Sequence, residues 1–308
     1  MPKLIMMVGI SGSGKSTVAM RYALTQSAII YSSDAIRGEI YGDENCQKDP
    51  GRVFDILHQR ITKTLSNGFD VVYDATNLSC KRRMNFLKSI AHIDCRKVCV
   101  VVVTTPEDIE ERMKSRDRKV PMEVVHKQLC QFQCPNYYEG WDSIQIKYNS
   151  TPEACHASYK KLWAECDIPH DNPHHSLSVM EHMNKAADIA EDLAWKVDEL
   201  SLVHERWVAR IHDIGKARTK SFTDRNGSPS EVAHYIGHQN YGAYYSLIFD
   251  NSDFDISEKD SLDNACLVQW HMEHYLRKGD ALIKFYDMLG PKLKNRLKVL
   301  EKADMTAH

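Results

Sequence analysis

An eight-residue glycine-rich segment near the start of the chain constrains the fold more than any other feature of the sequence. It follows a short apolar run at 4–8 and reads Gly-Ile-Ser-Gly-Ser-Gly-Lys-Ser from position 9 to position 16, which fits the pattern G-x-x-x-x-G-K-[ST]. In such a loop the backbone N–H groups cradle phosphates, the lysine reaches the β- and γ-phosphates, and the last hydroxyl binds Mg²⁺. The loop requires a strand before it and a helix after it. The sequence therefore predicts an α/β domain whose ATP and Mg²⁺ site is formed by Gly9, Gly12, Ser13, Gly14, Lys15, Ser16 and Thr17, with Ser16 as the metal ligand.

Apolar runs and amphipathic stretches alternate through the first 150 residues. We expect strands at 4–8, 28–31, 69–73 and 98–103, and the last of these is almost pure valine, as is typical of a parallel strand buried on both faces. Helical patterns separate these strands at about 16–25, 51–65, 81–90 and 107–116. This order predicts a doubly wound parallel sheet that binds phosphate at the carboxyl ends of its strands.

The character of the sequence changes after about residue 150. Strand-like runs largely vanish, and helical patterns such as 177–200 and 202–212 follow one another. Twelve of the 15 histidines lie in this half, whereas the first half has three. The stretch 167–174 contains two prolines and no apolar periodicity, so it is a loop, and the domain border falls within 149–175. We therefore expect an α/β domain at 1–150 and an all-α domain at 151–308.

Composition excludes several classes of protein. No apolar run approaches the roughly 20 residues that span a bilayer, and the short apolar start is not a secretory signal. The nine cysteines are an odd number without a Cys-x-x-Cys pair, which favours reduced thiols in the cytoplasm over disulfides or a metal clip. A net charge of −2 gives no overall basic surface, so any contact with nucleic acid must come from a local patch. The oligomeric state stays open.

Polar residues follow the second expected strand. Ser-Asp-Ala-Ile-Arg at 33–37 places Asp34 and Arg37 three residues apart on one face of a starting helix. At the carboxyl end of a strand that face points at the nucleotide, where Asp34 can accept a proton from an attacking hydroxyl and Arg37 can bind a phosphate of the acceptor. An N-capping aspartate beside a surface arginine explains the spacing equally well.

Two further polar segments lie in the first half. Asp-Ala-Thr-Asn at 74–77 follows the third expected strand, and Arg112, Arg116 and Arg118 precede Val120-Pro121. Arginines on a segment near transferring phosphates stabilise developing charge. The alternative for these arginines is a solvated basic helix end.

Together these segments resemble the kinase domain of phage-type polynucleotide 5′-kinases. The similarity spans nearly all of residues 1–150, including the lid run Glu-Arg-Met-Lys-Ser-Arg at 111–116 and the tail 135–144, which contains Glu-Gly-Trp-Asp. The Asp-Ala-Thr-Asn run is shared with related P-loop kinases that act on other hydroxyls. The resemblance therefore leaves the acceptor less defined than the reaction.

The resemblance implies a role for each matching residue. Lys15 and Ser16, with Mg²⁺, would hold the phosphates of ATP. Asp34 would be the general base for a 5′-hydroxyl, and Arg37 would bind the acceptor's phosphate. Arg112 and Arg116 would be the lid arginines.

The second half carries a histidine–aspartate pair at the end of an expected helix. His212 and Asp213 are followed by Ile-Gly-Lys, and we expect the helix to continue through them. Both side chains can reach one metal beside the helix. Imidazole with carboxylate suits a divalent ion such as Mn, Fe, Co, Ni or Zn with positions left for water, which suits phosphate hydrolysis.

This arrangement resembles the HD superfamily of metal-dependent phosphohydrolases. The resemblance implies four metal ligands, His182, His212, Asp213 and Asp304, and gives Lys216 a catalytic place after the pair. His238 and His271 resemble the additional histidines of members with two metals. Alternatives to His182 as the first ligand are His174 and His175, seven or eight residues upstream.

A kinase joined to a phosphohydrolase makes biochemical sense on a broken RNA or DNA end. One activity would phosphorylate the 5′-hydroxyl, and the other would remove a 2′,3′-cyclic or 3′-phosphate, so that a ligase can join the ends. A nucleoside or small-molecule kinase joined to an HD nucleotidase is the alternative enzyme. A nucleotide-sensing regulator with a degenerate second domain is a third reading, against which the complete His212-Asp213 pair and Asp304 argue.

Overall fold

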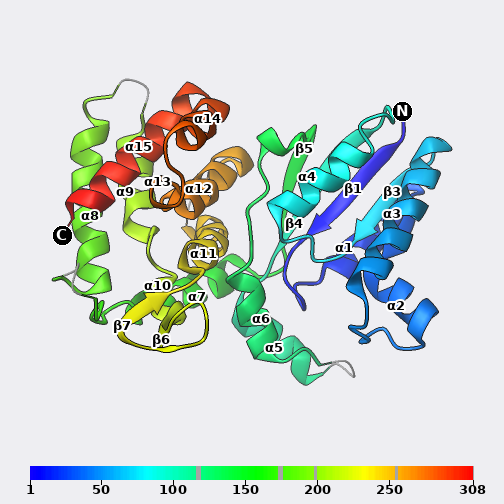
Figure 1. The fold of residues 1–308 in the computed structure, drawn as a ribbon, viewed down its shortest axis with the longest axis horizontal. Coiled ribbons are helices and arrows are strands. Elements are labelled where there is room, and N and C mark those ends of the chain that lie inside the picture. The colour runs from blue at the N-terminus through cyan, green and yellow to red at the C-terminus, as the bar shows by residue number, and fades with distance from the viewer. Residues whose placement is uncertain (116–118, 173–175, 198–199, 254–255, 308) are drawn as a thin grey trace. The chain divides into compact units, whose positions relative to one another are not determined.

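The chain folds into two compact units. The computed structural model describes residues 1–115, 119–172, 176–197, 200–253 and 256–307 (Figure 1). The first unit comprises Met1–Val125 and Pro135–Ser150, and the second comprises His126–Cys134 and Thr151–His308. The predicted first domain includes His126–Cys134, whereas the structure groups this segment with the second unit.

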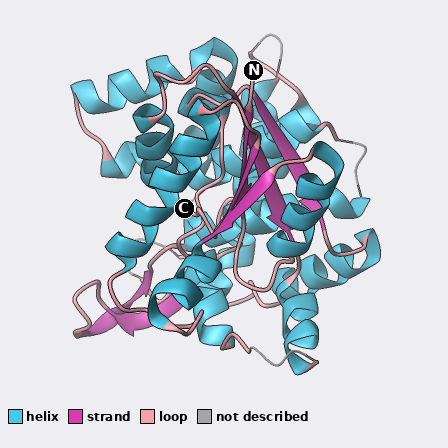
Figure 2. Cartoon of the chain, turned by 90° about the vertical axis from the view of Figure 1, so that its right-hand side faces the viewer, coloured by secondary structure: helices cyan, strands magenta, loops and turns pink. Residues whose placement is uncertain are grey.

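A five-stranded parallel sheet forms the centre of the first unit (Figure 2). Its order is β2 (Ile29–Ser32), β3 (Val71–Asp74), β1 (Lys3–Val8), β4 (Arg96–Val103) and β5 (Ser143–Tyr148). Successive residues 4–8 of β1 and 98–103 of β4 are all buried, so the sheet is covered on both faces. The α/β fold expected from the sequence is confirmed.

The helices of the first unit connect these strands. They are α1 (Lys15–Gln26), α2 (Ser33–Tyr41), α3 (Pro50–Ser66), α4 (Cys80–Ser89), α5 (Pro106–Lys114) and the short 3-10 helix η1 (Tyr137–Glu139). Helix α1 packs Val18 and Ala19 into the core formed by Ile5, Met7 and the valines of β4. The helix therefore starts directly above the sheet, at the carboxyl end of β1. Helix α6 (Met122–Leu129) crosses the division between the units.

The second unit is helical, as expected. It contains α7 (Pro152–Ala164), α8 (Val179–Ala194), α9 (Leu202–Ile211), α10 (Lys216–Thr219), α11 (His238–Asp253), α12 (Glu258–Trp270), α13 (Glu273–Leu276), α14 (Asp280–Met288) and α15 (Gly290–Thr306). Helix α8 begins with a capping box, in which Ser178 and Glu181 each accept a backbone N–H of the other. In the part of the chain that the structure describes, no helix is long and apolar enough to cross a membrane.

Two features of the second unit differ from the sequence-based expectation. An antiparallel hairpin joins β6 (Lys220–Thr223) to β7 (Pro229–Tyr235), seen at the lower left of Figure 2. The predicted continuous helix through His212 and Asp213 is wrong, because α9 ends at Ile211 and four turn residues precede α10. The break lets the two adjacent side chains turn toward one point.

Candidate active sites in the two units

The phosphate loop joins β1 to α1 as predicted. Gly14, the N-cap of α1, has a φ of +87°, and a Cβ built there would lie 2.2 Å from Nδ2 of Asn149. Asn149 Nδ2 and Thr104 Oγ1 donate to the Ser13 carbonyl at 2.7 and 2.8 Å. Among the described residues no side chain caps the N-terminus of α1 at Gly14, and a helix N-terminus is a favourable place for an anion. The loop therefore fits a phosphate.

The Lys15 side chain is buried within this loop. Its Nζ donates to the Ile10 carbonyl at 2.8 Å. Arg112 donates to the Asn149 carbonyl, and its Nη1 lies 3.6 Å from the position of a Cβ on Gly14. The structure thus places Lys15 and Arg112 at one loop, whereas Arg116 and Arg118 lie outside the described residues.

Asp74 is a site residue to which the sequence analysis gave no role. It ends β3, lies opposite Ser32 in the sheet register, and hydrogen-bonds Ser16. Burial raises the pKa of its carboxyl, while Ser16 and Lys15 act in the opposite direction. Carboxylate and hydroxyl oxygens suit Mg²⁺. Its signal in the sequence was an acid at the end of an apolar strand.

Asp34 and Arg37 form an ion pair at the start of α2. The N-cap of this helix is Ser32, whose hydroxyl accepts from the Asp34 N–H, so the N-capping alternative for Asp34 is wrong. Asp34 is close enough to Asp74 for its charge to raise the pKa of that carboxyl. The Asp34 side chain is 41% exposed and the Arg37 side chain 12%. The pair therefore stands beside the phosphate loop with its carboxylate open to solvent.

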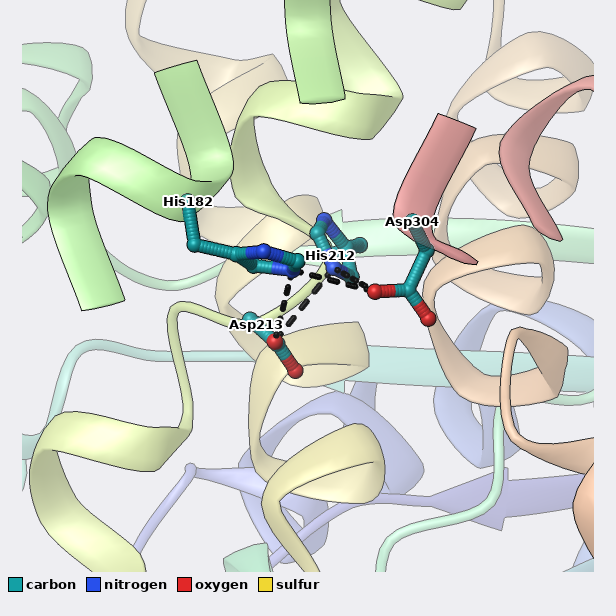
Figure 3. A group of neighbouring side chains, drawn as sticks. All are labelled: His182, His212, Asp213 and Asp304. Carbon is teal, nitrogen blue, oxygen red and sulfur yellow. Dashed lines mark hydrogen bonds and ion pairs between the residues drawn. The ribbon is translucent and has the colours of Figure 1, made fainter. Parts of the chain in front are cut away.

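The second unit gathers four of the predicted metal ligands in one buried cluster. Figure 3 shows His182 from α8, His212 and Asp213 from the turn after α9, and Asp304 from α15. Their ligand atoms lie within 4.8 Å of one another. His182 Nε2 lies 3.0 Å from Asp304 Oδ1, and His212 Nε2 lies 3.3 Å from both carboxylates. The alternative ligands His174 and His175 lie outside the described residues.

A second group shares Asp213 with the first. Asp213 Oδ1 lies 3.3 Å from His238 Nε2 and 3.5 Å from His271 Nε2, and these two nitrogens lie 3.3 Å apart. Asp213 Oδ2 faces the first group instead, at 3.3 Å from His212. The two oxygens of this one carboxylate therefore face different groups.

The histidines are oriented for metal binding. The Nδ1 atom of each lies within 3.2 Å of a backbone carbonyl, and the carbonyls belong to Ala307, Ala209, Tyr235 and Val268 for His182, His212, His238 and His271 respectively. Such a contact places the proton on Nδ1 and the lone pair on Nε2. The Nε2 atoms and the carboxylate oxygens then face one another, and His212 Nε2 and Asp213 Oδ1 are buried without a hydrogen-bond partner among the described residues. The donor set therefore fits a divalent cation at each group.

Burial and the neighbouring charges shift the pKa of three members of the cluster. Burial acts to raise the pKa of Asp213, but Lys216 and His212 hold it well below its usual range. Burial lowers the pKa of His238 to about 3, which keeps it neutral. Burial also acts to lower the pKa of His212, but Asp213 and Asp304 raise it to about 10. Without a metal His212 therefore carries a proton on Nε2, and a cation would have to displace this proton to bind there.

Lys216 and a histidine that the sequence analysis missed lie beside the cluster. Lys216 Nζ is 2.6 Å from Asp213 Oδ2 and 3.3 Å from His170 Nε2. His170 is 1% exposed, and its Nδ1 lies 2.9 Å from the Leu177 carbonyl. Burial, reinforced by the Lys216 charge, lowers the pKa of His170 to about 4. In the sequence His170 is one of several histidines in a proline-containing loop, with no spacing that sets it apart.

These two units define a P-loop kinase joined to a metal-dependent HD phosphohydrolase. Residues 4–135 match the family model of the AAA domain, and residues 174–307 match that of the HD domain. The chain is thus an enzyme with an ATP-binding kinase domain and a metal-binding HD domain.

Known proteins resemble parts of the chain. An L-seryl-tRNA(Sec) kinase from Methanococcus maripaludis is 24% identical over 204 residues, which is 64% of this chain and 77% of that protein. Among solved structures, a putative kinase from Chloroflexus aurantiacus is 15% identical with a TM-score of 0.42, covering 49% of this chain and 90% of that one. A chain of a Pnkp1/Rnl/Hen1 complex is 24% identical with a TM-score of 0.34, covering 39% of this chain and 41% of that one.

Proposed function

We propose that this enzyme heals broken RNA or DNA ends. Its kinase domain phosphorylates a 5′-hydroxyl with ATP, and its HD domain removes a 2′,3′-cyclic or 3′-phosphate. The observation that carries the proposal is one chain holding both a phosphate loop beside the Asp34–Arg37 pair and a buried His/Asp cluster. The products are the ends that a ligase joins, and we place the enzyme in the cytoplasm, because nine cysteines are an odd number that favours reduced thiols.

In the kinase reaction the residues of the first unit position two substrates. Lys15 and the loop hold the ATP phosphates, and Ser16 with Asp74 would hold Mg²⁺, which neutralises phosphate charge. Asp34 accepts the proton of the acceptor hydroxyl as its oxygen attacks the γ-phosphorus, and ADP leaves. Arg37 binds the phosphate of the acceptor. In the lid, Arg112 and Arg116 stabilise the charge on the transferred group.

In the phosphohydrolase reaction the buried cluster would hold a divalent transition metal. His182, His212, Asp213 and Asp304 would hold one ion, and Asp213, His238 and His271 a second. Such ions polarise the phosphate ester and lower the pKa of bound water. The ammonium of Lys216, fixed between Asp213 and His170, donates to a phosphate oxygen.

An end-labelling assay tests the proposal directly. The γ-phosphate of labelled ATP should transfer to 5′-hydroxyl oligonucleotides, and Asp34→Asn should reduce the transfer while His212→Ala leaves it unchanged. Glu39→Gln is the matched control, because Glu39 is an exposed acid on the same helix that pairs with Arg60. Labelling of free nucleosides but not oligonucleotides contradicts the end-healing function.

A second acceptor class follows from the curated relative. Its name gives L-seryl-tRNA(Sec) as the substrate, so a hydroxyl other than a 5′ end is the alternative acceptor for this kinase domain. A nucleoside or small-molecule kinase joined to an HD nucleotidase is the corresponding alternative for the whole chain. The same assay with oligonucleotide, seryl-tRNA and nucleoside acceptors separates these functions.

A further inference from the structure

The segment His126–Cys134 belongs to the second unit although it precedes the last strand of the first unit in the sequence. It also lies outside residues 174–307, which match the HD family. Phe132 is fully buried, and its ring packs edge-on against Tyr244 of α11 with ring centroids 5.1 Å apart. The HD unit thus includes a piece of chain that its family model does not cover.

One end of the segment contacts the start of α11. Asn240 Nδ2 donates to the Cys130 carbonyl at 2.9 Å. Gly237 has a φ of +83°, and a Cβ there would lie 2.7 Å from the same carbonyl, so the backbone of this turn sits directly against Cys130. The next residue is His238, and the Gly237 carbonyl accepts the N–H of Asn240 and Tyr241. Contact with Cys130 therefore fixes the turn that presents His238.

The other end contacts α12. The Cys134 N–H donates to Gln269 Oε1 at 2.7 Å, and the Cys134 thiol lies 4.0 Å from the Leu262 carbonyl. Leu262 and Gln269 lie two turns apart on one face of the helix. His271 follows Gln269 by two residues. The segment therefore contacts both α11, which begins at His238, and α12, which ends one residue before His271.

We propose that His126–Cys134 positions the second metal group, through the bonds of Cys130 to Asn240 and of Cys134 to Gln269. The first group stands mainly on α8, the turn after α9, and α15, which pack on one another. Loss of the segment's contacts should therefore release the second metal and leave the first. This inference rests on the proposed metal-dependent phosphohydrolase.

Metal content of the full-length protein tests the inference. We expect wild type loaded with Mn²⁺ and dialysed to hold an ion at each of the two groups. The double variant Asn240→Leu/Gln269→Leu should hold half as much, with the coupled two-ion signal in electron paramagnetic resonance replaced by that of a single ion. Two single variants at position 269 separate the bond from the side-chain volume. Gln269→Glu keeps an oxygen for the Cys134 N–H and should bind more metal than Gln269→Leu, which lacks one. Asn251→Leu on α11, the helix that carries Asn240, is the control, since Asn251 bonds Cys155 instead.

A double variant that retains two ions overturns the inference, and so does a wild type that binds only one. Retention of the first ion and an unchanged circular dichroism spectrum show that the second unit of the variants folds. Amide hydrogen exchange of wild type gives a second measurement. Removal of Mn²⁺ should increase exchange in 126–134 as well as in α11 and α12, and unchanged exchange in 126–134 contradicts the inference. Two bound ions without hydrolysis of any phosphate end would instead count against the proposed function alone.

Discussion

The two sites of this enzyme are built in opposite ways. The phosphate site is formed mostly by eight consecutive residues, which follow β1 and end in the first two residues of α1. The metal site draws side chains from five places between His182 and Asp304, and only His212 and Asp213 are adjacent. The first site therefore depends mainly on local sequence, whereas the second depends on the packing of a whole helical unit. A substitution in one site should therefore impair the activity of that site and leave the other activity unchanged.

The largest expected effect comes from Asp213, because it faces both metal groups. Asp213→Ala should remove both ions and lower phosphohydrolase activity by more than about 100-fold, since even changes behind a metal ligand cost about 10–100-fold. Phosphoryl transfer by the first unit should stay unchanged. Parallel assays of the two activities with metal analysis measure this, and a matching loss of kinase activity would contradict the independence of the sites.

Asp74 tests the phosphate site in the same way. Asp74→Asn should lower kinase kcat by about 100-fold and raise the Mg²⁺ concentration needed for half-maximal rate, because one charged contact to the metal and phosphates is lost. Asp70→Asn is the control, since Asp70 lies just before the same strand and bonds the Lys3 N–H instead. An unaltered Mg²⁺ dependence would exclude Asp74 as a metal ligand.

Much of the first unit could be predicted from the sequence, because a parallel sheet buried on both faces needs apolar runs and a phosphate loop needs fixed glycines. The strand β5 was missed, although Ile144 and Ile146 alternate with polar residues and are buried. The hairpin β6–β7 was missed too, although Asn226-Gly227 in its turn is a strong signal for a hairpin.

The candidate sites were predictable where residue type and spacing carry the chemistry. The structure brings the six histidine and aspartate candidates of the second unit together. It also adds His170 and the supporting segment 126–134, which no local pattern in the sequence predicts. His170 contacts a lysine 46 positions away, and Cys134 contacts a glutamine 135 positions away. Such contacts arise from tertiary packing, which spacing alone does not encode.

His170 offers a smaller effect within the second site. His170→Leu removes the acceptor for Lys216 Nζ and should lower phosphohydrolase kcat about 10–100-fold with little change in KM, as for other residues that orient a site. His170→Gln keeps an acceptor and should recover most of the loss. Equal damage from both variants, or a fall in metal content, would show a structural role for His170 instead.

The smallest effect concerns stability, and it contrasts two buried carboxylates of the second unit. Asp213 stays charged beside Lys216, whereas Asp250 is buried with neither oxygen in a hydrogen bond of good geometry. Burial raises the pKa of Asp250 to about 8, although Ser261 and Asn264 act to lower it. The nearby Arg296 is bonded to Glu205 at 2.6 Å and so compensates Asp250 only in part.

The direction of the pH dependence follows from these values. The folded protein keeps a proton on Asp250 up to about pH 8, whereas the unfolded chain loses it near pH 4. The contribution of Asp250 to the free energy of unfolding should therefore be most favourable below pH 4. It should fall by up to about 1.4 kcal/mol per pH unit as the pH rises toward 8. Asp250→Asn has no titrating group at this position, so its free energy of unfolding should decline less steeply with rising pH. Its kinase and phosphohydrolase activities should be unchanged. Denaturant midpoints of the two proteins between pH 5 and 8 measure the difference, and parallel curves would mean that Asp250 is already ionised in the folded unit.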